Sequence, residues 1–160
     1  MWSSIVAVVG TLAGAALATA FQHLADRRAR AEQYRQRITT VIAELLTASI
    51  AYRRETLRRF SLLRQGLDLT DADDDALHTA RSTLTNALDR VALTVDDHHL
   101  VALAYPVVWE AIEMSETALG MPANGRFADD VEAALTARRE AVRDAHTALR
   151  NAAREHVFGR

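Results

Sequence analysis

Cysteine and lysine are absent from this sequence of 160 residues, and it holds only two prolines. Without cysteine, neither a disulfide framework nor a thiolate metal site can form. All 19 basic residues are therefore arginine, and alanine is abundant. This bias is typical of a GC-rich genome, and we infer an actinobacterial source. The length allows one domain and an additional anchor.

Charge is also missing from the first 24 residues, from Met1 to Leu24. A helix of about 20 apolar residues, at about 1.5 Å each, crosses a hydrocarbon core of about 30 Å. Arginines follow this run, and positive charge beside a span is retained on the cytoplasmic side. We therefore expect residues 1–25 to form a single-pass transmembrane anchor at the cell membrane, with the N-terminus outside. Residues 26–160 would then form a cytoplasmic helical bundle.

Two other interpretations of the uncharged run are open. A cleaved secretory signal could end at Ala18-Thr19-Ala20, but such signals carry basic residues before the apolar region, and none occurs here. A helix buried in a protein core is the other interpretation. We favour the retained anchor, because the arginines lie only after the run.

Small residues recur at four-residue spacing within the predicted span, at Gly10, Gly14 and Ala18. This spacing places them on one face of a helix, where small side chains let two helices approach closely in lipid. We expect this face to mediate helix–helix association and formation of a homo-oligomer. The alternative is that the stripe only reflects a composition rich in alanine and glycine.

Basic residues dominate from Arg27 to Arg64, whereas acidic residues dominate from Asp68 to Glu132. Basic side chains next to a span are attracted to anionic lipid headgroups. We assign lipid headgroup contact to the arginines nearest the predicted membrane surface: Arg27, Arg28, Arg30, Arg35 and Arg37.

A second basic cluster consists of two adjacent pairs of arginines one helical turn apart: Arg53, Arg54, Arg58 and Arg59. Arginine is suited to the recognition of carboxylates and phosphates. The cluster is therefore a candidate partner-binding patch. The simpler interpretation is a surface that forms salt bridges with the acidic helices that follow it.

The whole chain is predicted to be helical, with an all-α fold. No Gly or Pro occurs between Ala15 and Gln65, so the anchor is expected to continue as one long helix from about residue 3 to 64. Three further helices are predicted: one after the acidic loop 68–75, one after Asp96 and Asp97, and one from about residue 128 to 155. Pro106 is expected to kink or interrupt the helix that follows Asp96 and Asp97. Short loops between long helices favour an antiparallel bundle, with packing of coiled-coil type.

Catalytic signatures are not found in the sequence. The pairs Asp75/His78 and Asp96/His99 have the carboxylate-x-x-His spacing of metal sites in bundles, but a helix would separate them by about 30 Å. No nucleophile triad, nucleotide motif or phosphate-binding glycine loop is present. We expect no catalytic residues, no metal, no cofactor and no enzymatic activity.

Several segments resemble the KilB family of small actinobacterial proteins, named after a kil-type spread protein of conjugative plasmids. The similar segments are Ile5–Gly14, Gln22–Leu24, Ala51–Arg54 and Leu135–His146. The resemblance implies a membrane-associated protein that acts in the spread of plasmids between mycelial cells. It brings no catalytic residues.

Two functional hypotheses follow. The first is a membrane-anchored, self-associating helical protein of plasmid spread or a related envelope process. The second is a membrane-tethered adaptor or regulator that binds a soluble partner or DNA. The expected partners are other copies of the chain, anionic lipid and an unidentified protein. Nucleic acid is less favoured, because the acidic middle of the bundle would repel phosphate.

Overall fold

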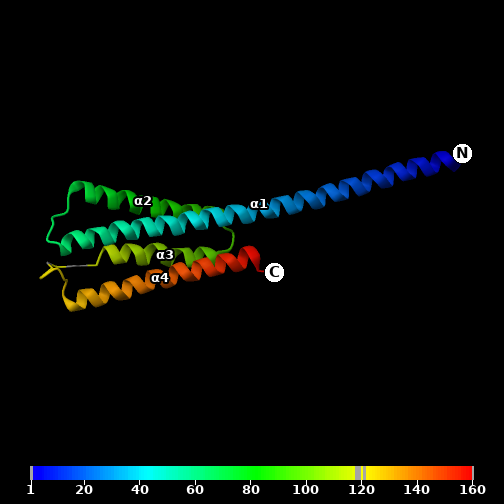
Figure 1. The fold of residues 1–160 in the computed structure, drawn as a ribbon. Helices are drawn as coiled ribbons and strands as arrows, with labels where there is room; N and C mark the ends of the chain where they lie inside the picture. The colour runs from blue at the N-terminus through cyan, green and yellow to red at the C-terminus, as the bar shows by residue number, and fades with distance from the viewer. Residues whose placement is uncertain (1, 118–119, 121, 160) are drawn as a thin grey trace. The chain divides into compact units, whose positions relative to one another are not determined.

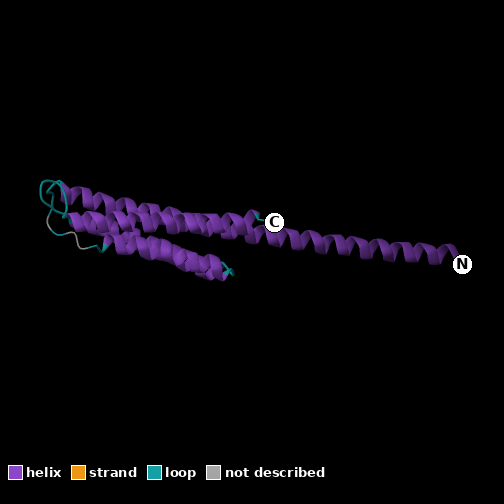
Figure 2. Cartoon of the chain, turned by 90° about the horizontal axis from the view of Figure 1, so that it is seen from below, coloured by secondary structure: helices purple, strands orange, loops and turns teal. Residues whose placement is uncertain are grey.

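The fold is known from a computed structural model. It describes the backbone of residues 2–117, 120 and 122–159, and the side chains of these residues apart from 2–21, 24 and 158. Four helices are described: α1 (Trp2–Arg64), α2 (Asp71–Thr94), α3 (His98–Ser115) and α4 (Asp129–Phe158). No strand occurs among the described residues; the prediction of an all-helical chain is confirmed in this part (Figure 2).

The chain divides into two compact units, residues 1–37 and residues 38–160. The first unit consists of the N-terminal part of α1. The second consists of the rest of α1 together with α2, α3 and α4. Within the second unit, successive helices run in opposite directions, so that α1 and α3 are parallel to each other and antiparallel to α2 and α4 (Figure 1). This is the antiparallel bundle that the short loops predict.

Local sequence fixes the starts of α2 and α3. Thr70 caps α2 in a capping box, in which its hydroxyl accepts from the Asp73 N–H and the Asp73 carboxylate accepts from the Thr70 N–H. Asp97 caps α3, because its carboxylate accepts hydrogen bonds from the N–H groups of His99 and Leu100. α3 thus begins directly after Asp96 and Asp97, as predicted, whereas α2 begins at Asp71, inside the segment 68–75 for which a loop is predicted.

Pro106 lies inside α3, which continues from His98 to Ser115 without interruption. The expected interruption is therefore wrong. A proline lacks the N–H of a normal helical residue, so one backbone hydrogen bond is lost in this helix. Two fully buried residues, Ala104 before and Val107 after that position in the sequence, hold α3 against the bundle.

The core of the second unit is apolar and draws on all four helices. Its largest fully buried side chains include Tyr52 of α1, Leu84 of α2, Leu100 of α3 and Leu135 of α4. The Tyr52 hydroxyl is hydrogen bonded to the Ser115 hydroxyl, so the polar end of this buried ring has a partner.

The predicted transmembrane helix is contradicted. In the part of the chain that the structure describes, no helix is both long enough and apolar enough to cross a membrane. This finding also overturns the predicted single-pass localisation at the cell membrane. The prediction relied on the absence of charge, but half of the residues 1–24 are Ala, Gly, Ser or Thr, which add little apolar surface. In addition, α1 does not end there but continues through charged, exposed positions from Asp26 onward.

Candidate functional site: the seam between α1 and α4

The seam between α1 and α4 is held at both ends by polar contacts between the two helices. At one end, Arg64 donates to both carboxylate oxygens of Glu132, each at 2.8 Å. Toward the other end, the imidazole Nε2 of His146 lies 3.3 Å from the carbonyl oxygen of Leu46. We call the facing surfaces of α1 and α4 between and beside these contacts the α1/α4 seam.

An aromatic cluster closes the Arg64 end of the seam. Phe127 packs edge-on against Phe60, with 6.4 Å between ring centroids, and the Arg64 guanidinium lies 5.0 Å from the Phe127 ring centroid. The hydrogen bond and charge of Arg64 hold the pKa of the Glu132 carboxyl below its ordinary value, although desolvation opposes this shift. The charged form of the Glu132 carboxyl is therefore favoured in this contact.

The preceding loop reaches this cluster through a tight turn. Asn124 and Gly125 adopt positive φ angles of 52° and 74°, and a Cβ at position 125 would lie 3.5 Å from the Arg64 carbonyl oxygen. Glycine suits a left-handed conformation close to another backbone. The turn thereby brings Phe127 against the end of α1.

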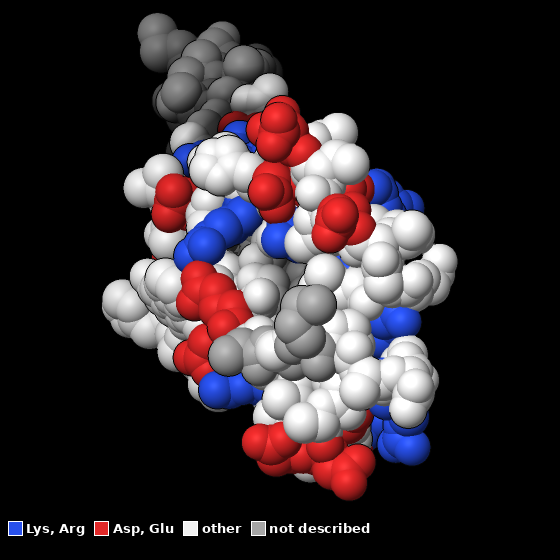
Figure 3. All heavy atoms as spheres, turned by 90° about the vertical axis from the view of Figure 1, so that its left-hand side faces the viewer, with Lys and Arg blue, Asp and Glu red and all other residues white. Residues whose placement is uncertain are grey.

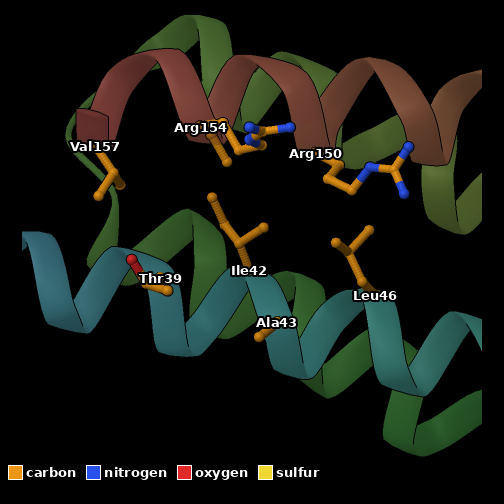
Figure 4. A pocket seen from close by; sticks show the side chains of 8 residues that line it. Thr39, Ile42, Ala43, Leu46, Arg150, Arg154 and Val157 are labelled. Carbon is orange, nitrogen blue, oxygen red and sulfur yellow. The ribbon is translucent and has the colours of Figure 1, made fainter. Parts of the chain in front are cut away.

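An open groove of about 160 Å³ lies at the other end of the seam, past His146. Ile42 and Leu46 point from α1 toward α4, and Val157 points back from α4 (Figure 4). Two arginines of α4, Arg150 and Arg154, line the same groove. An apolar floor with guanidinium groups beside it is suited to a ligand that is partly apolar and negatively charged.

Helix spacing places two further arginines in the middle of the seam, because Arg53 lies seven residues after Leu46 on α1 and Arg139 lies seven before His146 on α4. Both are partly buried, and the Nε atom of each is buried without a hydrogen-bond partner. No ion pair of either residue occurs among the described residues. The seam thus contains positive charge that the described part of the protein does not neutralise.

The predicted basic patch is divided between two sides of α1. Arg58 and Arg59 form ion pairs with Asp73 and Asp74 of α2. Arg54 is exposed and has only its sequence neighbour Glu55 as a partner, at 3.5 Å. Arg53 lies in the α1/α4 seam. The four side chains therefore do not form one surface, and their role in partner binding stays a prediction.

The arginines predicted to contact lipid, Arg27 to Arg37, lie in the first unit on α1. All five are exposed. Arg30 donates to the backbone carbonyl of Asp26 at 3.3 Å, and Arg35 lies 3.9 Å from Glu32. The assignment of these side chains to a lipid surface stays a prediction.

The predicted association stripe of Gly10, Gly14 and Ala18 lies in α1, but nothing is described of these side chains. Its role in helix–helix association stays a prediction. Among the described residues, no group of three or more His, Asp or Glu side chains is placed to hold a metal ion. The expectation that the protein works without a metal or cofactor is not tested by this observation.

Sequence reasoning missed the contribution of α4 to the seam. Arg139 lies seven residues after Glu132 and seven before His146, so all three share one helix face. The sequence spacing therefore indicates that these three residues share a face of α4. It does not indicate that this face contacts α1, which only the structure shows.

The fold places the chain among all-α bundle proteins, and a comparison of sequences identifies the family. The model of the KilB plasmid transfer protein family matches residues 39–157, and the chain belongs to this family. The matched region lies within the second unit, residues 38–160, which contains the bundle and the seam. No curated protein and no solved structure matches the chain.

Proposed function

We propose that this chain acts in plasmid transfer as a self-associating helical protein that works by binding and not by catalysis. Membership of the plasmid transfer family supports the process. The exposed aromatic face of α3 supports the self-association, and it is the observation that carries the proposal.

This aromatic face consists of Tyr105 and Trp109, which are 44% and 49% exposed. They are four residues apart on α3 and therefore neighbours on one side of the helix. Glu113 lies one further turn along and is also exposed. Half-exposed Trp and Tyr side chains are enriched in protein interfaces, where they often contribute most of the binding energy.

A second copy of the chain offers a complementary surface. The α1/α4 seam has an apolar groove beside Arg150 and Arg154, whereas the carboxylates near the aromatic face of α3, Glu113 and Glu116, are already paired with Arg138 and Arg81. An apolar groove can receive the rings of Tyr105 and Trp109, and guanidinium groups beside it can stack on the ring faces. Because the two surfaces differ, such a contact is heterologous and repeats from copy to copy, which generates rings or filaments.

The test is the mass of the full-length protein in solution, measured by sedimentation velocity over a range of concentrations. We expect the wild type to form species larger than a monomer. Trp109→Ser is expected to weaken association by about tenfold or more, since an aromatic anchor contributes about 2 kcal/mol or more.

Leu93→Ser is the matched control. Leu93 is 87% exposed on α2, so its replacement also removes an exposed apolar side chain but leaves α3 unchanged. It should leave the mass distribution unchanged. A monomeric wild type, or equal effects of the two substitutions, would contradict the proposal.

An adaptor or regulator that binds a soluble partner or DNA is the second candidate. It is favoured by the first unit, where five exposed arginines lie between residues 27 and 37. Phosphate contacts from arginine make binding to nucleic acid strongly salt-dependent. Under this alternative, a fluorescent DNA duplex binds the full-length protein with an affinity that falls steeply with salt, and replacement of Arg27, Arg28 and Arg30 by Gln reduces it.

A further inference from the structure

Buried side-chain polar atoms without a hydrogen-bond partner occur on both helices of the α1/α4 seam. Four such side-chain atoms occur in the described part of the protein: Glu44 Oε2, Ser49 Oγ, Arg53 Nε and Arg139 Nε. Glu44 is neutralised by Arg90 of α2 at 2.6 Å. The other three have no such compensation. Buried polar groups normally have hydrogen-bond partners, so several unpartnered atoms indicate that a partner is missing.

Helix geometry shows that Arg53 and Arg139 face each other. Arg53 lies seven residues after Leu46 and eleven before Arg64, and both of these contact α4. Seven and eleven residues correspond to about two and three helical turns, so Arg53 shares their face. Arg139 lies seven residues from both Glu132 and His146, the residues of α4 that make the same two contacts.

The two arginines also lie at nearly the same level along the seam. Counted from the contact between Leu46 and His146, each arginine is seven residues away, which gives no offset. Counted from the pair Arg64 and Glu132, Arg53 is eleven residues away along α1 and Arg139 is seven residues away along α4. The difference of four residues corresponds to an offset of about 6 Å along the helix axes. Arginine side chains are long enough to span an offset of this size.

Acidic side chains near this level are engaged elsewhere or point away. Glu132 is held by Arg64, and Glu55 lies between Arg54 and Arg58 on the side of α1 that faces α2. Asp144 pairs with its sequence neighbour Arg143 at 3.9 Å, and Glu140 is exposed on the outer side of α4. Two arginines whose Nε atoms are buried therefore lie opposite each other with no carboxylate paired to either, an arrangement that a bound anion would stabilise.

We propose that Arg53 and Arg139 bind a small oxyanion of the phosphate class across the α1/α4 seam. A phosphate dianion balances two guanidinium charges and accepts hydrogen bonds from both forks. Ser49, one turn from Arg53 on α1 and fully buried, supplies a hydroxyl on the inner side of the same place. The partial burial of both arginines favours a compact anion over a surface-bound polymer.

Thermal unfolding of the full-length protein tests this site, with inorganic phosphate as the probe and chloride at matched ionic strength as the reference. A ligand that binds only the folded state raises the unfolding temperature with its concentration. We expect this rise in the wild type. Arg53→Gln and Arg139→Gln should each abolish it, and each variant should be at least as stable as the wild type without phosphate, since the repulsion between the two charges is removed.

Arg54→Gln is the matched control, since it removes the neighbouring but exposed arginine. It should keep the full phosphate-dependent rise. Titration calorimetry with phosphate should show one site in the wild type and none in Arg53→Gln, independently of any change in stability.

The nature of the anion is separated by two further probes. Acetate at the same concentration should stabilise the wild type much less than phosphate, and equal effects would overturn the phosphate assignment. A nucleoside monophosphate that binds more tightly than inorganic phosphate would identify a phosphate ester as the ligand. No phosphate-dependent rise in the wild type, or an undiminished rise in Arg53→Gln, would overturn the site itself.

Discussion

The two seams that α1 forms within the bundle are built in opposite ways. On the α2 side, charges are paired: Arg58 with Asp73, Arg59 with Asp74 and Arg90 with Glu44. On the α4 side, one pair closes the end, and beyond it come two unneutralised arginines and an open apolar groove. The α2 seam therefore has the composition of a permanent internal contact, whereas the α4 seam has that of a surface prepared for a ligand.

The difference shows how little adjacency in sequence says about electrostatic environment. Arg53 and Arg58 are five residues apart, and at about 100° per residue this rotates the side chain to another face of α1. Arg58 consequently meets the acidic start of α2, whereas Arg53 lies opposite Arg139 of α4. At the end of the bundle seen in Figure 3, acidic groups lie in small clusters, with basic groups between and beside them.

The largest expected effect in this comparison comes from shortening an apolar residue of the α4 seam. Ile42 is buried at the floor of the groove. Ile42→Ala should lower the free energy of unfolding by about 2–4 kcal/mol, because it removes buried methylene groups and enlarges an existing hollow. Urea unfolding followed by circular dichroism measures this change.

Ile50→Ala is the control for that substitution, because Ile50 is exposed on the same helix. It should cost less than about 1 kcal/mol. Similar losses for the two variants would mean that the α4 seam is not an apolar contact in solution.

An intermediate effect is expected from the α2 seam. Asp73 is buried, completes the capping box of Thr70 and binds Arg58. Asp73→Ala should therefore lower the free energy of unfolding by about 1–2 kcal/mol. Asp74→Ala removes the neighbouring, exposed ion pair and should cost less than about 1 kcal/mol. Equal costs would show that ion pairing, and not capping, dominates this seam.

The smallest effect concerns pH and the start of α3. Desolvation raises the pKa of the Asp97 carboxyl, but the N–H groups of His99 and Leu100 and the imidazole of His156 together lower it below its ordinary value. A lowered pKa stabilises the fold above the ordinary Asp pKa of about 3.9, and this contribution is lost as pH falls through the lowered value.

Asp97→Asn should therefore reduce the loss of stability on acidification while leaving a capping residue in place. The measurement compares urea unfolding of the wild type and the variant at neutral pH and below pH 4. An identical acid-induced loss in both proteins would show that Asp97 does not contribute to the pH dependence.

Much of the helical fold could be predicted from the sequence, because its boundaries depend on neighbouring residues. The acidic cap at Asp97 marks the start of α3, and Gly120 and Gly125 mark the connection between α3 and α4, both through local chemistry. The site could not be predicted in the same way. Arg53 becomes distinctive only through Arg139, 86 residues later, and their relation depends on how α4 is rotated against α1. The membrane prediction failed for a related reason: absence of charge was counted, whereas the apolar surface of each side chain was not.

The cluster that closes the end of the α1/α4 seam has a consequence for the order of folding. Arg64 and its partner Glu132 are 68 residues apart, so a chain made from its N-terminus exposes the α4-facing side of α1 until α4 emerges. During this interval, Leu57 and Phe60 have no α4 to cover them, and the α4 helix of a neighbouring chain can take its place. Exchange of α4 between chains made side by side would join two copies without any new interface, because every contact of the seam would be kept.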